Sequence, residues 1–350
     1  MDLAALEQAA RGRLDRAVYD YVAGGAEAEL TLADNLAAWA RLRLRPRVLR
    51  DVRRVDTATS MLGTPLPTPI LVAPTAYHGL LHPDGELATA AGTAAAGSLL
   101  VLSTQANRSL EEVARHAPGT PRWFQVYVHA DHAFTEELVG RAAAAGCSAL
   151  VLTADLPVFG NRLRDVRNRL EFPPGMVLGN AVERFGAGGA DAVADASRFD
   201  AGLEPDAIAW LRDRSGLPVL VKGVLRGDDA EAFVAAGAAG IVVSNHGGRQ
   251  LDTALAAADA LPEVVAAVDG RAVVLVDGGV RRGTDVVKAL CMGAAGVLVG
   301  RPVLWGLASG GADGVRAVLS GLHEELLRAM ALCGAVSLAE LTPDLLAGPS

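Results

Sequence analysis

The stretch PVLVKGVLRGDDAEAFVAAGAAGIVVSN, residues 218–245, contains the unit from which we predict the fold. It holds two short runs, 218–221 and 240–243, in which nearly every residue is apolar. Continuous apolar runs are typical of strands that are buried on both faces of a parallel sheet. Between them, residues 228–236 have helical spacing. The stretch therefore predicts a strand, a helix and a second strand parallel to the first.

The same alternation continues on both sides of this unit. Six further apolar runs occupy residues 70–73, 99–102, 123–128, 149–153, 272–276 and 296–299. Helical stretches such as 131–145 separate most of them. Eight strand–helix units favour a closed (β/α)₈ barrel, the TIM barrel, over an open doubly wound sheet. We therefore predict an α/β protein whose TIM barrel spans residues 70–331.

The other segments of the 350-residue chain are predicted to surround this barrel. Residues 1–69 are expected to form an N-terminal helical extension and an extended arm. Residues 156–203, after the fourth strand, are expected to form a helix-poor, lid-like insert. Because no linker divides the chain, we predict a single domain over residues 1–350.

Composition limits the possible partners. The formal net charge of −8 gives no reason to expect nucleic acid or an anionic membrane surface. The three cysteines have neither pairing nor metal spacing, which fits a reducing cytoplasm. The uncharged stretch 87–107 is interrupted by Gly92 and Gly97, so we predict a helix, a turn and a strand there instead of a membrane span. We expect a soluble, cytoplasmic protein without a signal peptide.

Polar residues follow the apolar runs, at the end of the barrel where TIM-barrel active sites lie. In chain order these candidates are Pro74, Thr75, Ala76, Ser103, Gln105, Gln125, Tyr127, Thr153, Asp155, Lys222, Ser244, His246, Arg249, Asp277, Gly278, Gly279, Arg281, Gly300 and Arg301. Any one of them alone is also compatible with a turn or a helix cap. Together they are predicted to converge on one mouth.

Two groups among these candidates indicate chemistry. Glycines after the last two runs, with Arg281 and Arg301, predict the phosphate site that TIM barrels build from these loops. His246 can take up a proton near neutral pH, and Arg249 can hold a carboxylate with a bidentate fork. Asp155 is expected to orient the imidazole, although a purely structural His–Asp pair is the alternative. Lys222, at the end of a buried strand, is expected to point into the mouth.

Two other classes of site are not supported. His129 and His132 have i, i+3 spacing, but no third ligand is indicated, so no metal site is predicted. No nucleophile elbow appears, which argues against Ser-His-Asp hydrolysis.

Nine short motifs extend this pattern over nearly the whole chain. They are YDYVAGGAE (19–27), RPR (45–47), APTA (73–76), HPDGE (82–86), FQVY (124–127), TAD (153–155), SNHGGRQLD (244–252), DGGVRRGTD (277–285) and GRP (300–302). With these motifs in this order, the chain resembles the FMN-dependent 2-hydroxy acid oxidase and dehydrogenase family. That family includes glycolate oxidase, lactate oxidase, mandelate dehydrogenase and hydroxymandelate oxidase.

The resemblance implies FMN as cofactor and a role for each matching residue. Pro74, Thr75 and Ala76 would run along the flavin; Ser103, Gln125, Thr153 and Ser244 would bond its isoalloxazine and ribityl parts; Asp277, Gly278, Gly279, Arg281, Gly300 and Arg301 would hold ribityl and phosphate. Lys222 would stabilise the anionic reduced flavin.

The resemblance also implies how the substrate is held. His246 would be the base, paired with Asp155. Arg249 and Arg162 would bind the substrate carboxylate, and Tyr21 and Tyr127 would donate hydrogen bonds to it or to the hydroxyl. The hydrogen leaves either as a hydride or through a carbanion.

Two positions depart from the best-known members. Gln105 occupies a position that is a tryptophan in glycolate oxidase, which leaves a more polar wall at the tail of the substrate; Phe159 and Tyr77 are expected to complete this wall. Asn161 replaces an arginine next to Arg162. The insert also lacks the basic, apolar segment that anchors mandelate dehydrogenase to membranes.

We therefore expect oxidation of an (S)-2-hydroxy acid to the 2-keto acid, with oxygen reduced to hydrogen peroxide. The substrate is expected to be an aryl acid such as mandelate or a small acid such as lactate. Alternatives are a dehydrogenase with a quinone or protein acceptor and a decarboxylating enzyme like lactate monooxygenase. A prenyl diphosphate isomerase on an FMN barrel would not need His246, Arg249 and Arg162 together, and the intact set argues against a non-catalytic flavin protein. The resemblance implies a homo-oligomer, a tetramer or an octamer.

Overall fold

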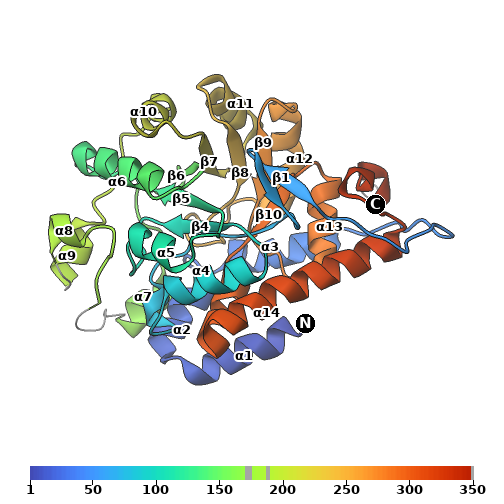
Figure 1. Cartoon of the computed structure of the whole chain (residues 1–350), viewed down its shortest axis with the longest axis horizontal. Coiled ribbons are helices and arrows are strands. Elements are labelled where there is room, and N and C mark those ends of the chain that lie inside the picture. The colour runs from blue at the N-terminus through green and yellow to red at the C-terminus, as the bar shows by residue number, and fades with distance from the viewer. Residues whose placement is uncertain (170–175, 187–189, 348–350) are drawn as a thin grey trace.

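The computed structural model describes residues 1–169, 176–186 and 190–347. Its centre is a closed barrel of parallel strands in the order β10-β3-β4-β5-β6-β7-β8-β9 (Figure 1). The strands are β3 (Ile70–Val72), β4 (Leu100–Ser103), β5 (Arg122–Val126), β6 (Leu150–Thr153), β7 (Val219–Val224), β8 (Gly240–Val243), β9 (Val273–Val276) and β10 (Gly296–Val299). Each overlaps the apolar run predicted for it, so the predicted TIM barrel is confirmed.

The two faces of these strands are buried in different places. Each strand contributes one side chain to the cluster that fills the barrel, namely Leu71, Val101, Trp123, Val151, Leu220, Val242, Leu275 and Leu298. The residues beside them, such as Val72 and Val221, belong to the layer between barrel and helices. Since both faces exclude water, the strands are apolar throughout instead of alternating.

A short antiparallel hairpin, β1 (Thr59–Met61) and β2 (Thr64–Leu66), closes the amino-terminal end of the barrel. Met61 and Leu66 belong to the interior cluster, and the Met61 side chain lies beside Gly296, the first residue of β10. The sequence predicted only an extended arm here. Three-residue strands with threonine, serine and proline carry too little pattern to be recognised.

Helices cover the outside of the barrel (Figure 1). They are α4 (Glu86–Ala95), α5 (Leu110–His116), α6 (His132–Ala144), α10 (Asp206–Ser215), α11 (Gly227–Ala235), α12 (Ala257–Val268), α13 (Gly283–Cys291) and α14 (Arg301–Cys333). The stretch 87–107 forms the rest of α4, a turn at Gly97 (φ +66°) and β4, as predicted. In the described ranges, no helix combines the length and apolar character needed to cross a membrane.

Three helices precede the hairpin: α1 (Leu3–Arg13), α2 (Arg16–Ala23) and α3 (Leu30–Arg41). The start of α3 has no capping side chain of its own, because Glu29 at its N-cap makes no side-chain cap bond. Instead, the Asp252 carboxylate accepts hydrogen bonds from the backbone amides of Ala28 (3.1 Å) and Thr31 (2.9 Å). A residue from the far half of the chain therefore caps α3.

The insert after β6 is more helical than predicted. Its described part contains α7 (Leu163–Asn168), α8 (Val182–Phe185) and α9 (Ala190–Asp195), so the expectation of a helix-poor segment was wrong. The insert ends in an Ala/Gly/Asp-rich stretch, residues 186–200, which lies partly outside the described residues. Its end is held to the barrel, because the Asp200 amide donates to the Val128 carbonyl and the Ala130 amide to the Arg198 carbonyl.

Candidate active site

A cavity of about 860 Å³ opens at the carboxyl ends of the barrel strands. Its wall includes most of the residues predicted from sequence: Tyr21, Pro74, Thr75, Ala76, Ser103, Gln105, Tyr127, Arg162, Lys222, His246, Arg249, Asp277, Gly278, Gly279, Arg281, Gly300 and Arg301. Four others, Asp155, Gln125, Thr153 and Ser244, do not line it but hydrogen-bond to residues that do or to one another. The volume lies in the upper part of the range for cofactor and ligand sites.

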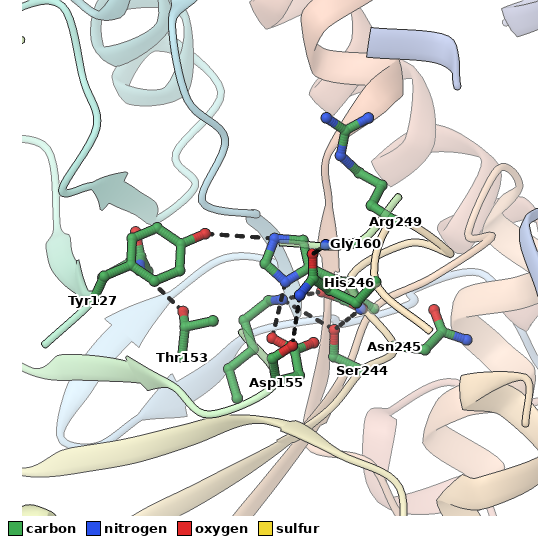
Figure 2. Close-up of polar contacts among 12 residues, drawn as sticks. Tyr127, Thr153, Asp155, Gly160, Ser244, Asn245, His246 and Arg249 are labelled. Carbon is green, nitrogen blue, oxygen red and sulfur yellow. Dashed lines mark hydrogen bonds and ion pairs between the residues drawn. The ribbon is translucent and has the colours of Figure 1, made fainter. Parts of the chain in front are cut away.

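His246 and Asp155 form the pair at the centre of the mouth (Figure 2). The Nδ1 atom of His246 lies 2.9 Å from Oδ1 of Asp155, and Nε2 lies 3.5 Å from the Tyr127 hydroxyl. Because a carboxylate only accepts, Nδ1 carries the proton and Nε2 is left as a base.

Burial and charge tune these groups. Burial lowers the pKa of His246 below its ordinary value, although Asp155 opposes the shift. Burial alone would raise the pKa of Asp155, but the charges of His246 and Lys222 hold it below its usual range. Burial raises the pKa of Tyr127, so its hydroxyl stays protonated and available as a donor. At neutral pH the site thus contains a neutral imidazole, a carboxylate and a phenol.

Arg249 and Arg162 provide positive charge beside this pair. The Arg249 guanidinium lies over the Tyr21 ring, 4.8 Å from its centroid, and donates to the carbonyls of Tyr21 (2.6 Å) and Gly24 (3.1 Å). Burial, with repulsion from Arg162, lowers the pKa of Arg249 to about 10. Within the described chain neither arginine forms an ion pair with a carboxylate. The two cations therefore favour an anionic ligand.

Lys222 lies within β7, two residues before the strand ends at Val224. Its ammonium donates to the Ser244 hydroxyl (3.0 Å) and is 3.4 Å from Oδ2 of Asp277. Burial alone would lower the pKa of Lys222, but Asp277 and Asp155 raise it above its ordinary value, so the lysine stays charged. The other oxygen of Asp277, Oδ1, is buried and has no hydrogen-bond partner among the described residues. A hydroxyl of a ligand is the kind of donor that it lacks.

A second polar chain runs across the ends of β4, β5 and β6. The Ser103 hydroxyl donates to Oε1 of Gln125 (3.1 Å), and Nε2 of Gln125 donates to the Thr153 hydroxyl (3.0 Å). The strand register places these residues side by side, because Ser103 pairs with Gln125. Ser103, Gln125 and Thr153 thus form a continuous row of hydrogen-bonded polar side chains at the floor of the site.

The loops after β9 and β10 form a cradle for an anion. Gly278 and Gly279 both have φ +82°, and a Cβ atom on Gly279 would lie 2.1 Å from the Asn35 carbonyl oxygen, so no side chain fits there. Among the described residues, Arg301 donates only to the carbonyls of Val22, Gly24 and Gly247. Burial and the nearby Arg249 and Arg281 lower the pKa of Arg301 to about 9. This uncompensated charge, at the uncapped start of α14, suits a phosphate.

The residues present therefore fit FMN. The cradle matches its phosphate, the orphaned oxygen of Asp277 matches a ribityl hydroxyl, and the polar floor with Lys222 matches the heteroatom edge of the ring. The same cavity leaves the His246 imidazole and the two arginines facing the space beside it.

Sequence reasoning missed the contribution of the insert. Val193, Ala194 and Ser197 line the cavity, and the Ser197 hydroxyl accepts a hydrogen bond from Nε2 of Gln105 (2.7 Å). Phe199 stacks on Tyr127 with ring centroids 4.5 Å apart. No periodicity or motif marks these residues, so only the folded chain brings them to the site.

Comparisons with known proteins agree with this site. A family model described as FMN-dependent dehydrogenase matches residues 10–348. L-lactate oxidase of Nostoc sp. strain PCC 7120 is 50% identical over 351 residues, covering 97% of this chain and 96% of that protein. Glycolate oxidase 1 of Zea mays is 49% identical over 340 residues, covering 95% and 92%.

Solved structures give the same result. Mandelate oxidase with (S)-4-hydroxymandelic acid is 44% identical, with a TM-score of 0.92 and coverage of 99% of this chain and 98% of that chain. A mandelate oxidase mutant with a C4a-OH-FMN adduct is 43% identical, with a TM-score of 0.86 and coverage of 96% and 97%. The resemblance and the cofactor predicted from sequence are confirmed. The chain therefore belongs to the FMN-dependent dehydrogenase family, and it is an FMN-dependent oxidoreductase.

Proposed function

We propose that this enzyme oxidises (S)-2-hydroxy acids with an aryl substituent, such as mandelate, and accepts small acids such as lactate as second-best substrates. Like its lactate, glycolate and mandelate oxidase relatives, the enzyme oxidises a 2-hydroxy acid and uses oxygen as the electron acceptor. The observation that carries the proposal is the unprotonated Nε2 of His246, which faces the same cavity as two arginines that have no carboxylate ion pair among the described residues.

The carboxylate of the substrate binds to Arg249 and Arg162. Arg249 is already held by two backbone carbonyls and by the Tyr21 ring, so little side-chain freedom is lost on binding. Tyr127 and Tyr21 donate hydrogen bonds to the carboxylate or the hydroxyl. This clamp fixes which face of the 2-carbon meets the base, which is the basis for (S) selectivity.

One of the two hydrogens that the substrate loses moves to His246 as a proton. Nε2 of the imidazole takes it from the substrate, and the Asp155 carboxylate stabilises the imidazolium through the bond to Nδ1. FMN, when bound, would accept the two electrons of the oxidation together with the second hydrogen that the substrate loses. Lys222, which stays charged, stabilises negative charge at the floor of the site. Hydrogen peroxide is the product on the oxygen side.

The tail of the substrate lies against the wall formed by Gln105, Tyr77 and Phe159, with Ser197 behind Gln105. Gln105 is smaller than the tryptophan of glycolate oxidase and leaves room for a ring. Aromatic neighbours around this space favour an aryl group over a methyl group.

The test is anaerobic reduction of the yellow holoenzyme. (S)-Mandelate, (S)-lactate and glycolate are added separately, and bleaching of the flavin absorbance is followed. Fastest bleaching by (S)-mandelate supports the proposal, whereas fastest bleaching by glycolate contradicts the substrate assignment. No bleaching by any 2-hydroxy acid overturns the proposed roles of His246 and the arginines.

Admission of air then distinguishes the acceptor. Rapid reoxidation with release of peroxide is expected. Slow reoxidation in air, with fast reoxidation by a quinone, would favour the dehydrogenase alternative, and carbon dioxide in place of peroxide would favour the decarboxylating one.

We also propose that the enzyme is a cytoplasmic homo-oligomer, a tetramer or an octamer. The acidic composition and three buried, free cysteines support a reducing compartment. Exposed apolar side chains such as Leu49 and Leu251 support contacts between copies. Sedimentation analysis of the purified protein tests the assembly, and a monomer at micromolar concentration contradicts it.

A further inference from the structure

A pair of buried asparagines joins α3 to the loop that carries His246. Nδ2 of Asn35 donates to Oδ1 of Asn245 (2.9 Å), and Nδ2 of Asn245 donates to Oδ1 of Asn35 (2.8 Å). Asn35 is 2% exposed and Asn245 5%. Neither residue lines the cavity, so neither touches substrate.

The amide of Asn245 uses its full hydrogen-bonding capacity. Its oxygen also accepts from the backbone amide of Gly248 (3.1 Å), and its nitrogen also donates to the Leu255 carbonyl (3.0 Å). Asn245 therefore closes the turn that contains His246 and ties it to Leu255, ten residues further along the chain. Figure 2 shows Asn245 directly beside His246 and Ser244 in this turn.

Asn35 also meets the loop after β9. Its backbone carbonyl oxygen occupies the space beside Gly279, where a Cβ atom would lie only 2.1 Å away. Four residues later on the same helix face, Nε1 of Trp39 donates to the Gly278 carbonyl (2.7 Å). One face of α3 thus contacts both the loop of the base and the loop of the anion cradle.

We propose that Asn35 is a positioning residue for the oxidation, which holds His246 in register with the cofactor through Asn245. This inference rests on the proposed role of His246. If the Asn35 amide is lost, Asn245 keeps an unpaired buried donor and acceptor, and its side chain rotates to find other partners. The Gly248 amide then keeps only its bond to the backbone carbonyl of Asn245 (3.0 Å), and the less tightly held turn lets the imidazole shift relative to the clamp.

The test compares two variants of the holoenzyme with the wild type. Asn35→Leu removes the amide, and the double variant Asn35→Leu/Asn245→Leu replaces the pair with apolar groups of similar size. Leu36→Ala, at an exposed position on the same helix, is the matched control. The measurements are anaerobic flavin reduction, KM, the pH dependence of kcat/KM, FMN affinity and Tm.

We expect Asn35→Leu to lower the rate of flavin reduction on the order of 10–100-fold. KM should change little, and the acid limb of the pH profile should move, because the surroundings of His246 change. The double variant should recover part of the loss in Tm but not the reduction rate, because Gly248, Leu255 and Ala257 still lack the side-chain partners that the two asparagines supply. Leu36→Ala should match the wild type.

Two results overturn the inference: a single variant that keeps the wild-type rate and pH profile, or a double variant that recovers the rate together with Tm. If Asn35→Leu does not fold, Asn35→Asp keeps the shape and replaces the donor with an acceptor, and the same loss of rate is expected. Wild-type protein that no 2-hydroxy acid reduces refutes the proposed function itself, whatever the variants do.

Discussion

His246 adopts a left-handed backbone conformation, with φ +58°, and Gly247 (+64°) and Gly248 (+75°) follow in the same region. This conformation costs a non-glycine residue roughly 1–2 kcal/mol. The Ser244 hydroxyl, which accepts from the His246 amide at 3.1 Å, helps to offset that cost. The motif around His246 thus sets the backbone conformation of this turn and also supplies its reactive side chains.

His246→Asn tests the base without disturbing the turn, because asparagine tolerates left-handed backbone better than most residues. Flavin reduction by the best substrate should fall by about 10²–10⁴-fold. FMN content, read from the visible absorbance, should stay at the wild-type level. A variant that reduces its flavin at the wild-type rate would show that another group takes the proton.

The pH dependence follows from the neutral state of the imidazole. Activity falls when His246 becomes protonated, and since burial lowers its pKa, the acid limb of kcat/KM should lie below pH 6.5 in the wild type. Asp155 raises the pKa of His246, so Asp155→Asn should move this limb to still lower pH while reducing kcat. A limb that moves to higher pH would contradict the assigned pair. Steady-state profiles of both proteins give the comparison.

Gln105→Trp tests the tail wall. The larger ring should fill the space beside Tyr77 and Phe159 and break the bond to Ser197. The ratio of kcat/KM for (S)-mandelate to that for glycolate should fall by at least about tenfold, because a misfit in a packed pocket is worth 1–3 kcal/mol. An unchanged ratio would place the aryl group elsewhere.

At the level of elements, the insert is tied to the N-terminal extension. Arg164 on α7 pairs with Glu29 (2.5 Å) and Asp20 (3.4 Å), and Asn168 donates to Asp20 (2.8 Å). Since Arg162 is the residue directly before α7, these bonds also hold one arm of the carboxylate clamp.

Arg164→Met should therefore raise KM several-fold and leave FMN affinity unchanged. Arg167→Met is the matched control, because Arg167 is exposed on the same helix and has no ion pair in the described ranges. Steady-state kinetics measures KM, and titration of the apoprotein with FMN measures the flavin affinity. Equal KM values in both variants would mean that the ion pairs do not hold the clamp.

The elements that could be predicted from sequence are those whose faces all have the same kind of surroundings. Barrel strands are recognised because both faces are apolar, and their carboxyl ends meet in one place whatever the loops do. That rule brings Lys222 and His246 together from sequence alone. The rule does not identify Asn35 and Ser197, because neither follows a barrel strand. Each reaches the site through packing between segments that are far apart in the chain. The hairpin at Met61 could not be predicted because each of its strands has only three residues, too few to show a pattern.

At the level of the whole molecule, a protein with net charge −8 concentrates buried cations at one mouth. Burial lowers the pKa values of Arg249, Arg281 and Arg301, and repulsion adds to the shift at two of them, from Arg162 on Arg249 and from Arg249 and Arg281 on Arg301. Binding of FMN should relieve this repulsion and stabilise the folded state.

Removal of FMN should lower Tm by several degrees. Inorganic phosphate should restore part of the loss in the apoprotein, more than chloride at the same ionic strength, because the cradle is specific for a phosphate. Thermal unfolding followed by circular dichroism measures both effects. Equal effects of phosphate and chloride would indicate only general screening of charge.

The cap that Asp252 supplies to α3 also sets an order of events in time. The backbone amide of Thr31 donates to the carboxylate of Asp252, which is 221 residues later in the chain. At a synthesis rate of 5–20 residues per second, that interval is roughly 11–44 s. During it the ribosome has released the helix start but not yet made the residue that caps it. The start of α3 therefore lacks its cap until β8, the sixth barrel strand, and the loop after it have been synthesised. A nascent chain shorter than this also lacks part of the pocket that binds the flavin.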